Sequence, residues 1–333
     1  MEPQVDAGPV TMRRLTESQY RASIADIFSP DIPIAGRFEP GIRTEGLIAI
    51  GAGEAGISPF SMEQYNISAS SIAAAVTSET FRNTLLPCQP DTIEQFDDNC
   101  VTQIISHYGR LLFRRPLDSG ELQRYQTLTR NAWSTLGEFY GAVEFGLTAL
   151  LISPDFLLRV ERLQINPEQP ELQQLDPFSM AERLSFFLTG ASPDDKLLSA
   201  AENDELSTPT GLKKQVERLL ASPRFEYALR DFFSDMLMFD AIDELRKDPI
   251  IYPVFNSQLA YDAKEQTLRT IVYHLLEQQG DYRQLFTLRE TFLTRNLGPV
   301  YRLPVTSKNG WEKKSFAADS ERVGIQSNPS FLM

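Results

Sequence analysis

The alternation of apolar and polar residues along most of the chain is typical of amphipathic α-helices. Between Gln258 and Leu276, for example, Tyr261, Leu268 and Val272 fall on one face of a helix with 3.6 residues per turn. No stretch approaches the roughly 18 unbroken apolar residues of a membrane-spanning helix, and the richest window, 145–158, is interrupted by a Ser-Pro-Asp sequence. We therefore predict a mainly α fold, an irregular helical bundle, without a transmembrane segment.

Residues that start helices recur through the chain. Thr16 is placed to cap a helix that runs to Phe28, and Asp118 with Glu121 has the spacing of a capping box. Ser134 and Asp176 are further predicted N-caps, the latter with a proline at the first helical position. Two similar corners, Leu-Leu-Ile-Ser-Pro-Asp-Phe at 150–156 and Leu-Leu-Ala-Ser-Pro-Arg-Phe at 219–225, indicate turns of a bundle and not a long repeat array.

Composition shifts divide the chain into regions. Residues 36–58 are rich in glycine and weakly periodic, so an irregular N-terminal segment is expected there. Residues 166–175, with two prolines, are the predicted linker between an N-terminal helical region, 1–165, and a C-terminal helical domain, 176–303. The pattern is lost over 304–333, which we expect to be an irregular tail.

The charge balance limits the partners that the chain would bind. The 333 residues are 42% apolar and carry a formal net charge of −13. A nucleic-acid backbone or an anionic membrane surface attracts clustered Lys and Arg, so neither is expected as the main partner, whereas a cationic partner would suit the charge. The first six residues lack the basic and apolar regions of a signal peptide. The chain is then either cytosolic, or the mature part or a fragment of a longer protein.

Two cysteines, Cys88 and Cys100, lie in a stretch rich in Pro and Asp. Their spacing permits a disulfide that closes a small loop, and it equally permits two free thiols in a reducing cytosol.

Common cofactor and metal motifs give little support for a bound group. Gly51, Gly53 and Gly56 match a dinucleotide-binding pattern after a strand-like stretch, 47–50, but the next helix, at Ser58-Pro59, begins too late to place the third glycine inside it. A flexible loop is the favoured interpretation. His107 and His274 have no metal-type partner at helical spacing, and there is no Cys-x-x-Cys-His motif for haem attachment. We expect neither a cofactor-binding nor a metal site in this chain.

A few charged residues are candidates for chemistry. Glu265 falls on the apolar stripe of its predicted helix, where desolvation would raise the pKa of its carboxyl and suit it to general acid–base catalysis; the alternative is an ion pair with Arg269. Arg114 and Arg115 at a helix end could bind carboxylates in bidentate fashion, or form internal ion pairs or a helix C-cap. Arg183 has the same alternatives.

Several blocks in order resemble a known group of proteins. The blocks are Met-Arg-Arg-Leu-Thr-Glu-Ser-Gln-Tyr at 12–20, Phe-Arg-Arg-Pro-Leu at 113–117, Leu-Ile-Ser-Pro-Asp-Phe at 151–156, Ala-Glu-Arg-Leu-Ser-Phe-Phe-Leu at 181–188, Glu-Gln-Thr at 265–267 and Thr-Phe-Leu-Thr-Arg-Asn at 291–296. They resemble large exported bacterial proteins, common in planctomycetes, that are built from the domain-of-unknown-function families 1587, 1595 and 1592 in tandem. The first two families would cover about 12–78 and 100–162.

The resemblance implies a compartment and a partner but no reaction. Proteins of this group are exported, which favours a Cys88–Cys100 disulfide and an extracytoplasmic location in the periplasm or cell envelope. They often have a cytochrome c module in the same chain or a neighbouring one, so c-type haem would belong to a missing module or a partner. Arg322–Ile325 with 330–332 resembles the opening of a further domain, which predicts a truncated chain.

Three functions remain open from the sequence. The first is an extracytoplasmic scaffold or binding protein that works with a c-type cytochrome or another cell-envelope component. The second is a polysaccharide hydrolase with Glu265 as general acid/base and a second carboxylate opposite. The third is a cytosolic protein with free thiols.

Overall fold

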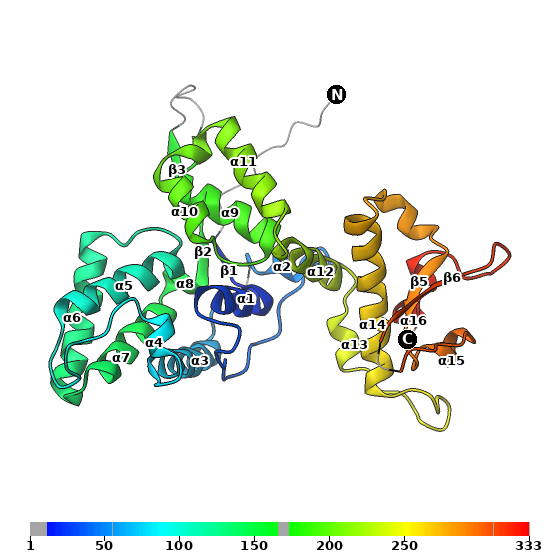
Figure 1. Ribbon diagram of the computed structural model, residues 1–333, viewed down its shortest axis with the longest axis horizontal. Coiled ribbons are helices and arrows are strands. Elements are labelled where there is room, and N and C mark those ends of the chain that lie inside the picture. The colour runs from blue at the N-terminus through cyan, green and yellow to red at the C-terminus, as the bar shows by residue number, and fades with distance from the viewer. Residues whose placement is uncertain (1–11, 55, 166–172, 309, 333) are drawn as a thin grey trace. The chain divides into compact units, whose positions relative to one another are not determined.

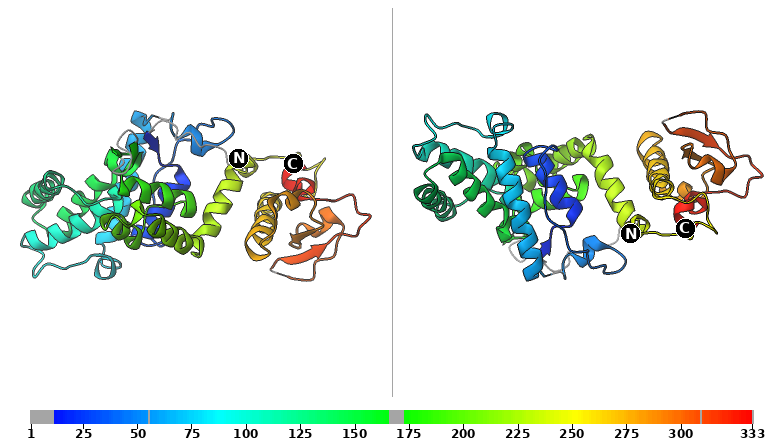
Figure 2. Two further views of the ribbon diagram at one scale, coloured as in Figure 1. Left: turned by 90° about the horizontal axis from the view of Figure 1, so that it is seen from above. Right: turned by 90° about the horizontal axis from the view of Figure 1, so that it is seen from below.

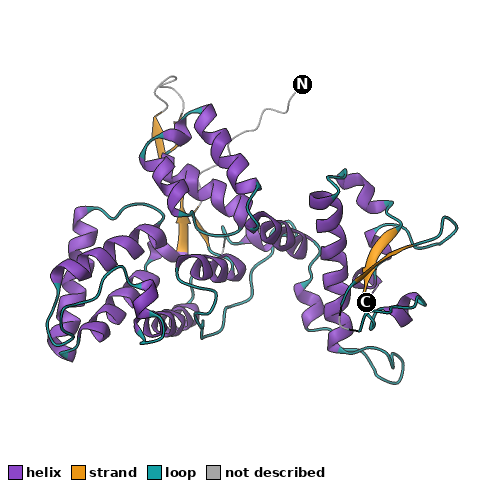
Figure 3. Cartoon of the chain, viewed as in Figure 1, coloured by secondary structure: helices purple, strands orange, loops and turns teal. Residues whose placement is uncertain are grey.

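The computed structural model describes residues 12–54, 56–165, 173–308 and 310–332 of the chain. The chain is 57% helical, with sixteen helices and a few short strands among the described residues, which confirms the predicted mainly α fold (Figure 3). It divides into two compact units, residues 1–225 and 226–333.

The first unit is a set of helices, some joined by short turns and others by long loops such as the one between α1 and α2 (Figure 1). Its helices are α1 (Glu17–Ile27), α2 (Ile48–Gly51), α3 (Pro59–Thr77), α4 (Arg82–Leu85), α5 (Asp98–Phe113), α6 (Ser119–Leu136), α7 (Phe139–Leu151), α8 (Pro154–Leu157), α9 (Pro177–Thr189), α10 (Asp195–Glu202), the 3₁₀ turn η1 (Glu205–Ser207) and α11 (Pro209–Leu220). Four short strands accompany them: β1 (Met12–Arg14), β2 (Leu158–Val160), β3 (Leu163–Ile165) and β4 (Gln173–Leu175).

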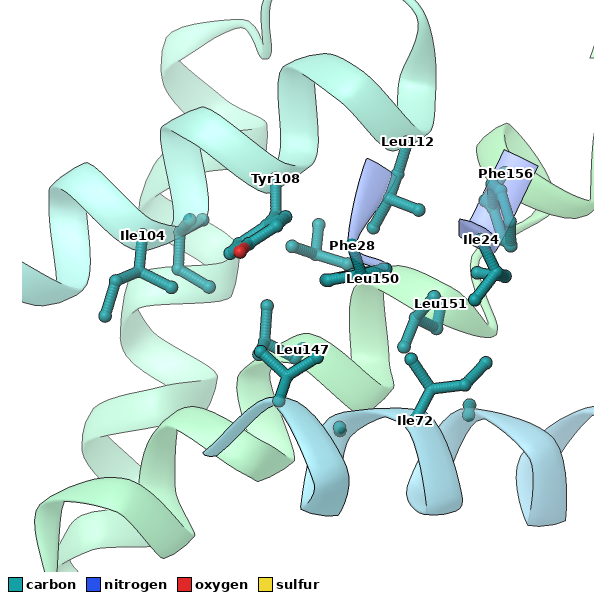
Figure 4. Packing of buried hydrophobic residues seen from close by; sticks show 14 of the residues in the cluster. Ile24, Phe28, Ile72, Ile104, Tyr108, Leu112, Leu147, Leu150, Leu151 and Phe156 are labelled. Carbon is teal, nitrogen blue, oxygen red and sulfur yellow. The ribbon is translucent and has the colours of Figure 1, made fainter. Parts of the chain in front are cut away.

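The main core of this unit lies between α1, α3, α5, α7 and α8. Figure 4 shows Ile24 of α1, Ile72 of α3 and Leu150 of α7 turned toward Tyr108 and Leu112 of α5. All five side chains are buried. A smaller apolar cluster joins α9, α10 and α11. Burying a large apolar side chain contributes about 1.5–3 kcal/mol of stabilisation. These two clusters are therefore the main source of stability in the unit.

Local capping fixes where the helices begin. The Thr16 hydroxyl accepts a hydrogen bond from the Gln19 N–H, and Asp118 forms the predicted capping box with Glu121. Asp176 caps α9 ahead of a proline, also as predicted. The prediction for Ser134 was wrong, because this residue lies inside α6. That helix ends at Gly137, whose φ of 70° is easily reached only by glycine, and Glu138 caps α7.

The strands of the first unit form short, two-stranded antiparallel sheets. β1 pairs with β2, so that Met12 faces Val160, and β3 pairs with β4. The strand expected at 47–50 is instead the helix α2, with a single bridge between Thr44 and Leu47. Of the predicted linker, residues 166–172 lie outside the described residues, and Gln173–Leu175 is strand β4.

The second unit is built around one long helix, α14 (Ser257–Val272), which continues into a π-helical turn, η2 (Tyr273–Glu277). The hairpin of β5 (Glu290–Leu293) and β6 (Glu312–Ser315) lies beside it (Figures 1 and 2). The remaining elements are α12 (Arg224–Met236), which starts just before the boundary, α13 (Asp240–Asp243), the 3₁₀ turn η3 (Tyr282–Phe286), α15 (Gly298–Tyr301), the 3₁₀ turn η4 (Ile325–Ser327) and α16 (Pro329–Leu332). Two apolar clusters include residues of α14, one shared with α12 and α13 and the other with β5 and α15.

Over the residues that the structure describes, none of the helices has the length and apolar character needed to cross a bilayer.

Candidate functional site

Arg114 is the most deeply buried arginine of the first unit. It ends α5 in a left-handed conformation, with φ of 59°, and its side chain is 3% exposed. Its guanidinium donates to the carbonyl oxygens of Asp155 (2.7 Å), Phe156 (3.1 Å) and Leu158 (2.7 Å). These carbonyls belong to α8 and the start of β2, so Arg114 joins the end of α5 to the segment that follows α7.

A buried carboxylate balances this charge. Glu182 of α9 has one oxygen 3.2 Å from Nε of Arg114 and 3.5 Å from Nε of Arg159 in β2. The Arg159 guanidinium also lies over the Phe186 ring, 4.5 Å from its centroid. Burial lowers the pKa of both guanidinium groups, and the charge of Glu182 opposes that shift. Glu182 therefore stands between two buried cations and supplies their shared counter-charge.

Arg115 forms a second, more accessible part of the same cluster. Its guanidinium is bidentate to Glu121, at 2.7 and 2.8 Å, and reaches Asp155 at 3.0 Å. The hydrogen bonds from Arg115 lower the pKa of Glu121 to about 2. Because the Glu121 carboxylate also accepts a hydrogen bond from the Asp118 N–H in the capping box of α6, this ion pair helps to fix the start of that helix.

A small, partly open hollow with a cavity volume of about 30 Å³ lies over this cluster. Its wall is formed by charged residues of α5, α8, β2 and α9 with a few apolar side chains: Phe113, Arg114, Arg115, Asp155, Leu158, Val160, Arg162, Asp176, Phe178, Ser179 and Glu182. Arg162, which is half exposed, lies 3.9 Å from Asp155. Most of the charges in the wall neutralise one another, so the hollow has no strong preference for an anion or a cation.

The other predicted arginine of this region forms a simple pair. Arg183 on α9 contacts Glu161 at 2.8 and 2.5 Å, with an exposed guanidinium. Exposed pairs of this kind contribute about 0.2–1 kcal/mol.

Glu265 lies in the second unit and is held by two arginines. Its carboxylate is 3.0 Å from Arg230 of α12 and 3.1 Å from Arg269 one turn along α14. Arg230 also binds Glu226, at 2.8 Å. The Arg230 guanidinium therefore stands between the carboxylates of Glu226 and Glu265. In a glycosidase the space between the two catalytic carboxylates is left for the sugar. The geometry is that of a structural ion pair, and the catalytic role of Glu265 stays a prediction.

Sequence reasoning missed a buried polar network around Asp262 and Gln266 of α14. The carboxylate of Asp262 accepts from Thr294 (2.6 Å), Asn296 (3.0 Å) and Gln258 (2.8 Å). One turn along, the Gln266 amide donates to Thr291 (2.9 Å) and to the Tyr301 hydroxyl (2.6 Å).

The network continues to the last described helix. The Tyr301 hydroxyl donates to the Asn328 amide oxygen at 3.2 Å, and the Asn328 amide donates to Thr267 at 3.0 Å. The sequence blocks at 265–267 and 291–296 supply five of its members, Gln266, Thr267, Thr291, Thr294 and Asn296, and these two blocks were the available sequence signal. The network ties α14 to β5, α15 and residues 328–330, which makes it part of the packing of this unit.

The remaining predicted residues are distributed through both units. Cys88 and Cys100 form a disulfide. His274 is buried, and its Nε2 lies 2.9 Å from the Asp281 carbonyl oxygen, whereas His107 lies on α5 beside Tyr108. Gly51 and Gly53 lie at the end of α2 and in the loop after it, and Gly56 is also in a loop. In the described part of the chain no three His, Cys, Asp or Glu side chains are grouped as a metal site would require.

Comparison with protein-family models finds three matches. Residues 13–78 match a protein of unknown function (DUF1587), residues 100–161 a protein of unknown function (DUF1595), and residues 175–303 a protein of unknown function (DUF1592). No curated protein and no solved structure matches the chain.

These matches define a class of protein that is built from small tandem helical domains. The chain belongs to the group that carries DUF1587, DUF1595 and DUF1592 in this order, which confirms the resemblance found in the sequence.

Proposed function

We propose that this chain is an extracytoplasmic helical scaffold or binding protein that works beside a c-type cytochrome. The main support for a scaffold role is that buried charged side chains of the chain are paired with one another. Arg114 and Arg159 of the DUF1595 region pair with Glu182 of the DUF1592 region, and the polar network around Gln266 links segments within the DUF1592 region. In both places the polar side chains bind one another. This pairing supports a structural role for them in packing the helices, in preference to a catalytic one.

The extracytoplasmic location is supported by the disulfide and by the group to which the domains belong. Disulfides persist in oxidising compartments and are rare in the cytosol. Mass spectrometry of the unreduced protein, isolated from the periplasm of an expression host, tests this part. Recovery of two free thiols would contradict it.

The cytochrome partner is supported by charge. The chain has a net charge of −13, and a partner with a lysine-rich face would be steered toward it at long range. Such steering weakens as salt shortens the Debye length from roughly 30 Å at 0.01 M to about 8 Å at 0.15 M.

Calorimetric titration with a lysine-rich c-type cytochrome at these two salt concentrations tests the partner. We expect binding at low salt that weakens by about tenfold or more at the higher concentration. The same cytochrome with its lysines acetylated is the control, and it should not bind. Equal affinity for both forms, or no binding at low salt, would remove the cytochrome from the proposal.

A further inference from the structure

The connection between α13 and α14 presents an unusual set of exposed apolar side chains. In this apolar loop, defined as residues 249–254, Ile250 is 88% exposed, Ile251 67%, Val254 60% and Tyr252 48%. The next residue, Phe255, packs against both apolar clusters of the second unit and anchors the loop at its base. The loop protrudes from the start of α14, in yellow in Figure 1.

The backbone of the apolar loop has few free donors. Pro249 and Pro253 have no N–H group. The Ile250 N–H donates to the Asp248 carboxylate at 2.8 Å, and the Tyr252 N–H donates to the Asp248 carbonyl oxygen at 2.8 Å. An unpaired backbone polar group is costly to place in hydrocarbon. In this loop most positions either have no N–H group, because they are prolines, or have an N–H group that already donates a hydrogen bond, so the loop is suited to an apolar environment.

Two cations precede the loop. The Lys247 ammonium lies 5.1 Å from the centroid of the Tyr252 ring, and the Arg246 guanidinium donates to its neighbour's carbonyl oxygen. In the described structure neither has a carboxylate within ion-pairing distance. Of the acids nearby in sequence, Asp243 is paired with Lys264 and Asp248 is engaged by the loop backbone, while Glu244 adds one negative charge.

We propose that the apolar loop inserts into the interface of a phospholipid bilayer, so that the chain binds the membrane surface without crossing it. Branched aliphatic side chains would enter the acyl region, Tyr252 would lie at the headgroup level, and Arg246 and Lys247 would meet lipid phosphates. The apolar side chains are on a protruding loop. A protein partner would need a pocket of matching shape to bind such a loop, whereas a fluid bilayer would not. With a net charge of −13 on the chain, binding depends on apolar burial and gains little from anionic lipid.

Flotation of the full chain with phosphatidylcholine vesicles tests the proposal. We expect the chain to float with the vesicles, and replacement of a third of the lipid by phosphatidylglycerol to change the partition coefficient by less than about threefold. The double variant Ile250→Ser/Ile251→Ser should lower the partition coefficient by about tenfold or more, because two large apolar side chains no longer enter the bilayer. The matched control is Phe187→Ser, at a side chain that is 78% exposed in the first unit, and it should partition like the wild type.

A second measurement locates the insertion. In the Ile251→Trp variant, brominated phosphatidylcholine should quench the added fluorescence, whereas the native Trp133 and Trp311 provide the unquenched baseline. Urea unfolding should give the same midpoint for the double Ser variant as for the wild type, since the replaced side chains are exposed. Failure of the wild type to float, equal flotation of the double variant, or absence of quenching would each overturn the proposal. Loop-dependent capture of a protein without vesicle binding would also overturn it.

Discussion

Glu182 stands between the buried guanidinium groups of Arg114 and Arg159, so each of the three charges depends on the others. Removing water from a charge costs several kcal/mol, and the cost is recovered only while the opposite charge remains in place. The backbone of Arg114 adds to this constraint, because a non-glycine residue with φ of 59° costs about 1 kcal/mol.

Loss of the Glu182 charge should therefore be strongly destabilising. We expect Glu182→Gln to lower the free energy of unfolding by about 3–5 kcal/mol, since it leaves two buried cations without a counter-charge. Urea unfolding followed by circular dichroism measures the change. The control is Glu17→Gln, which breaks the exposed pair with Arg21 and should cost at most about 1 kcal/mol. Similar losses in the two variants would contradict the account of this cluster.

Glu121 makes a separate prediction about pH. Hydrogen bonds from Arg115 lower the pKa of its carboxyl in the folded chain to about 2, below the roughly 4.3 of an unfolded glutamate. The stabilisation is complete above the unfolded value and is lost as the pH falls toward 2, because the unfolded state binds the proton first.

The pH dependence can be measured as urea midpoints between pH 6 and pH 2. We expect Glu121→Gln to lose about 1–2 kcal/mol at neutral pH and to show a flatter decline with acid than the wild type. Parallel declines in the two proteins would show that Glu121 does not contribute to acid sensitivity.

The sequence identified several charged residues and one local pair, Glu265 with Arg269, but not the partners that lie far away along the chain. Arg114 and Arg115 were recognised from the Arg-Arg-Pro block, and Arg269 from its helical spacing to Glu265. Glu182 lies 68 residues from Arg114, Asp155 lies 40 residues from Arg115, and Arg230 lies 35 residues from Glu265. Such pairs depend on how helices pack, which local spacing does not encode.

Elements were predictable where a local signal defines them. The caps at Thr16, Asp118 and Asp176 are side chains that bind N–H groups two or three residues away, so they can be recognised without knowledge of the fold. Strands of three or four residues are too short to show a period-two pattern in the sequence. β1 and β2 form a sheet only with each other, so neither can be recognised until the pairing is known.

Close helix packing in the first unit depends on one glycine. A Cβ added to Gly146 of α7 would lie 2.3 Å from Oγ1 of Thr129 on α6 and 3.2 Å from Cδ1 of Ile105 on α5. Gly146 therefore allows α7 to approach both neighbouring helices.

Substitution of this glycine should separate the three helices. We expect Gly146→Ala to lower the free energy of unfolding by about 1–3 kcal/mol, in spite of the better helix propensity of alanine. Gly120→Ala is the matched control, because its added Cβ would meet only Asp118 at 3.3 Å near the start of α6. Thermal unfolding compares the two, and a stable Gly146→Ala variant would show that the helices can move apart at little cost.

The disulfide affects the molecule as a whole because it limits the unfolded chain. It joins Cys88, ahead of α5, to Cys100 in the first turn of that helix, twelve residues later. Spacing alone left this pairing open, and the resemblance to exported proteins favoured it.

Loss of this link should reduce global stability in a way that depends on redox conditions. We expect the Cys88→Ser/Cys100→Ser variant to lose about 2–3 kcal/mol, the loop-closure contribution of a short cross-link. Urea unfolding with and without dithiothreitol measures the effect: reductant should destabilise the wild type to the level of the variant and leave the variant unchanged. A reductant-insensitive wild type would contradict this expectation.

The pairing of β1 with β2 has a consequence for how these domains can be inherited. Arg13 and Arg159 face each other across the pair, although Arg13 is the first residue of the DUF1587 region and Arg159 lies near the end of the DUF1595 region. A gene rearrangement that moved either region alone would separate the two strands. Residues 12–160 should therefore travel between genes together, and with them α9, whose Glu182 supplies the counter-charge of Arg114 and Arg159.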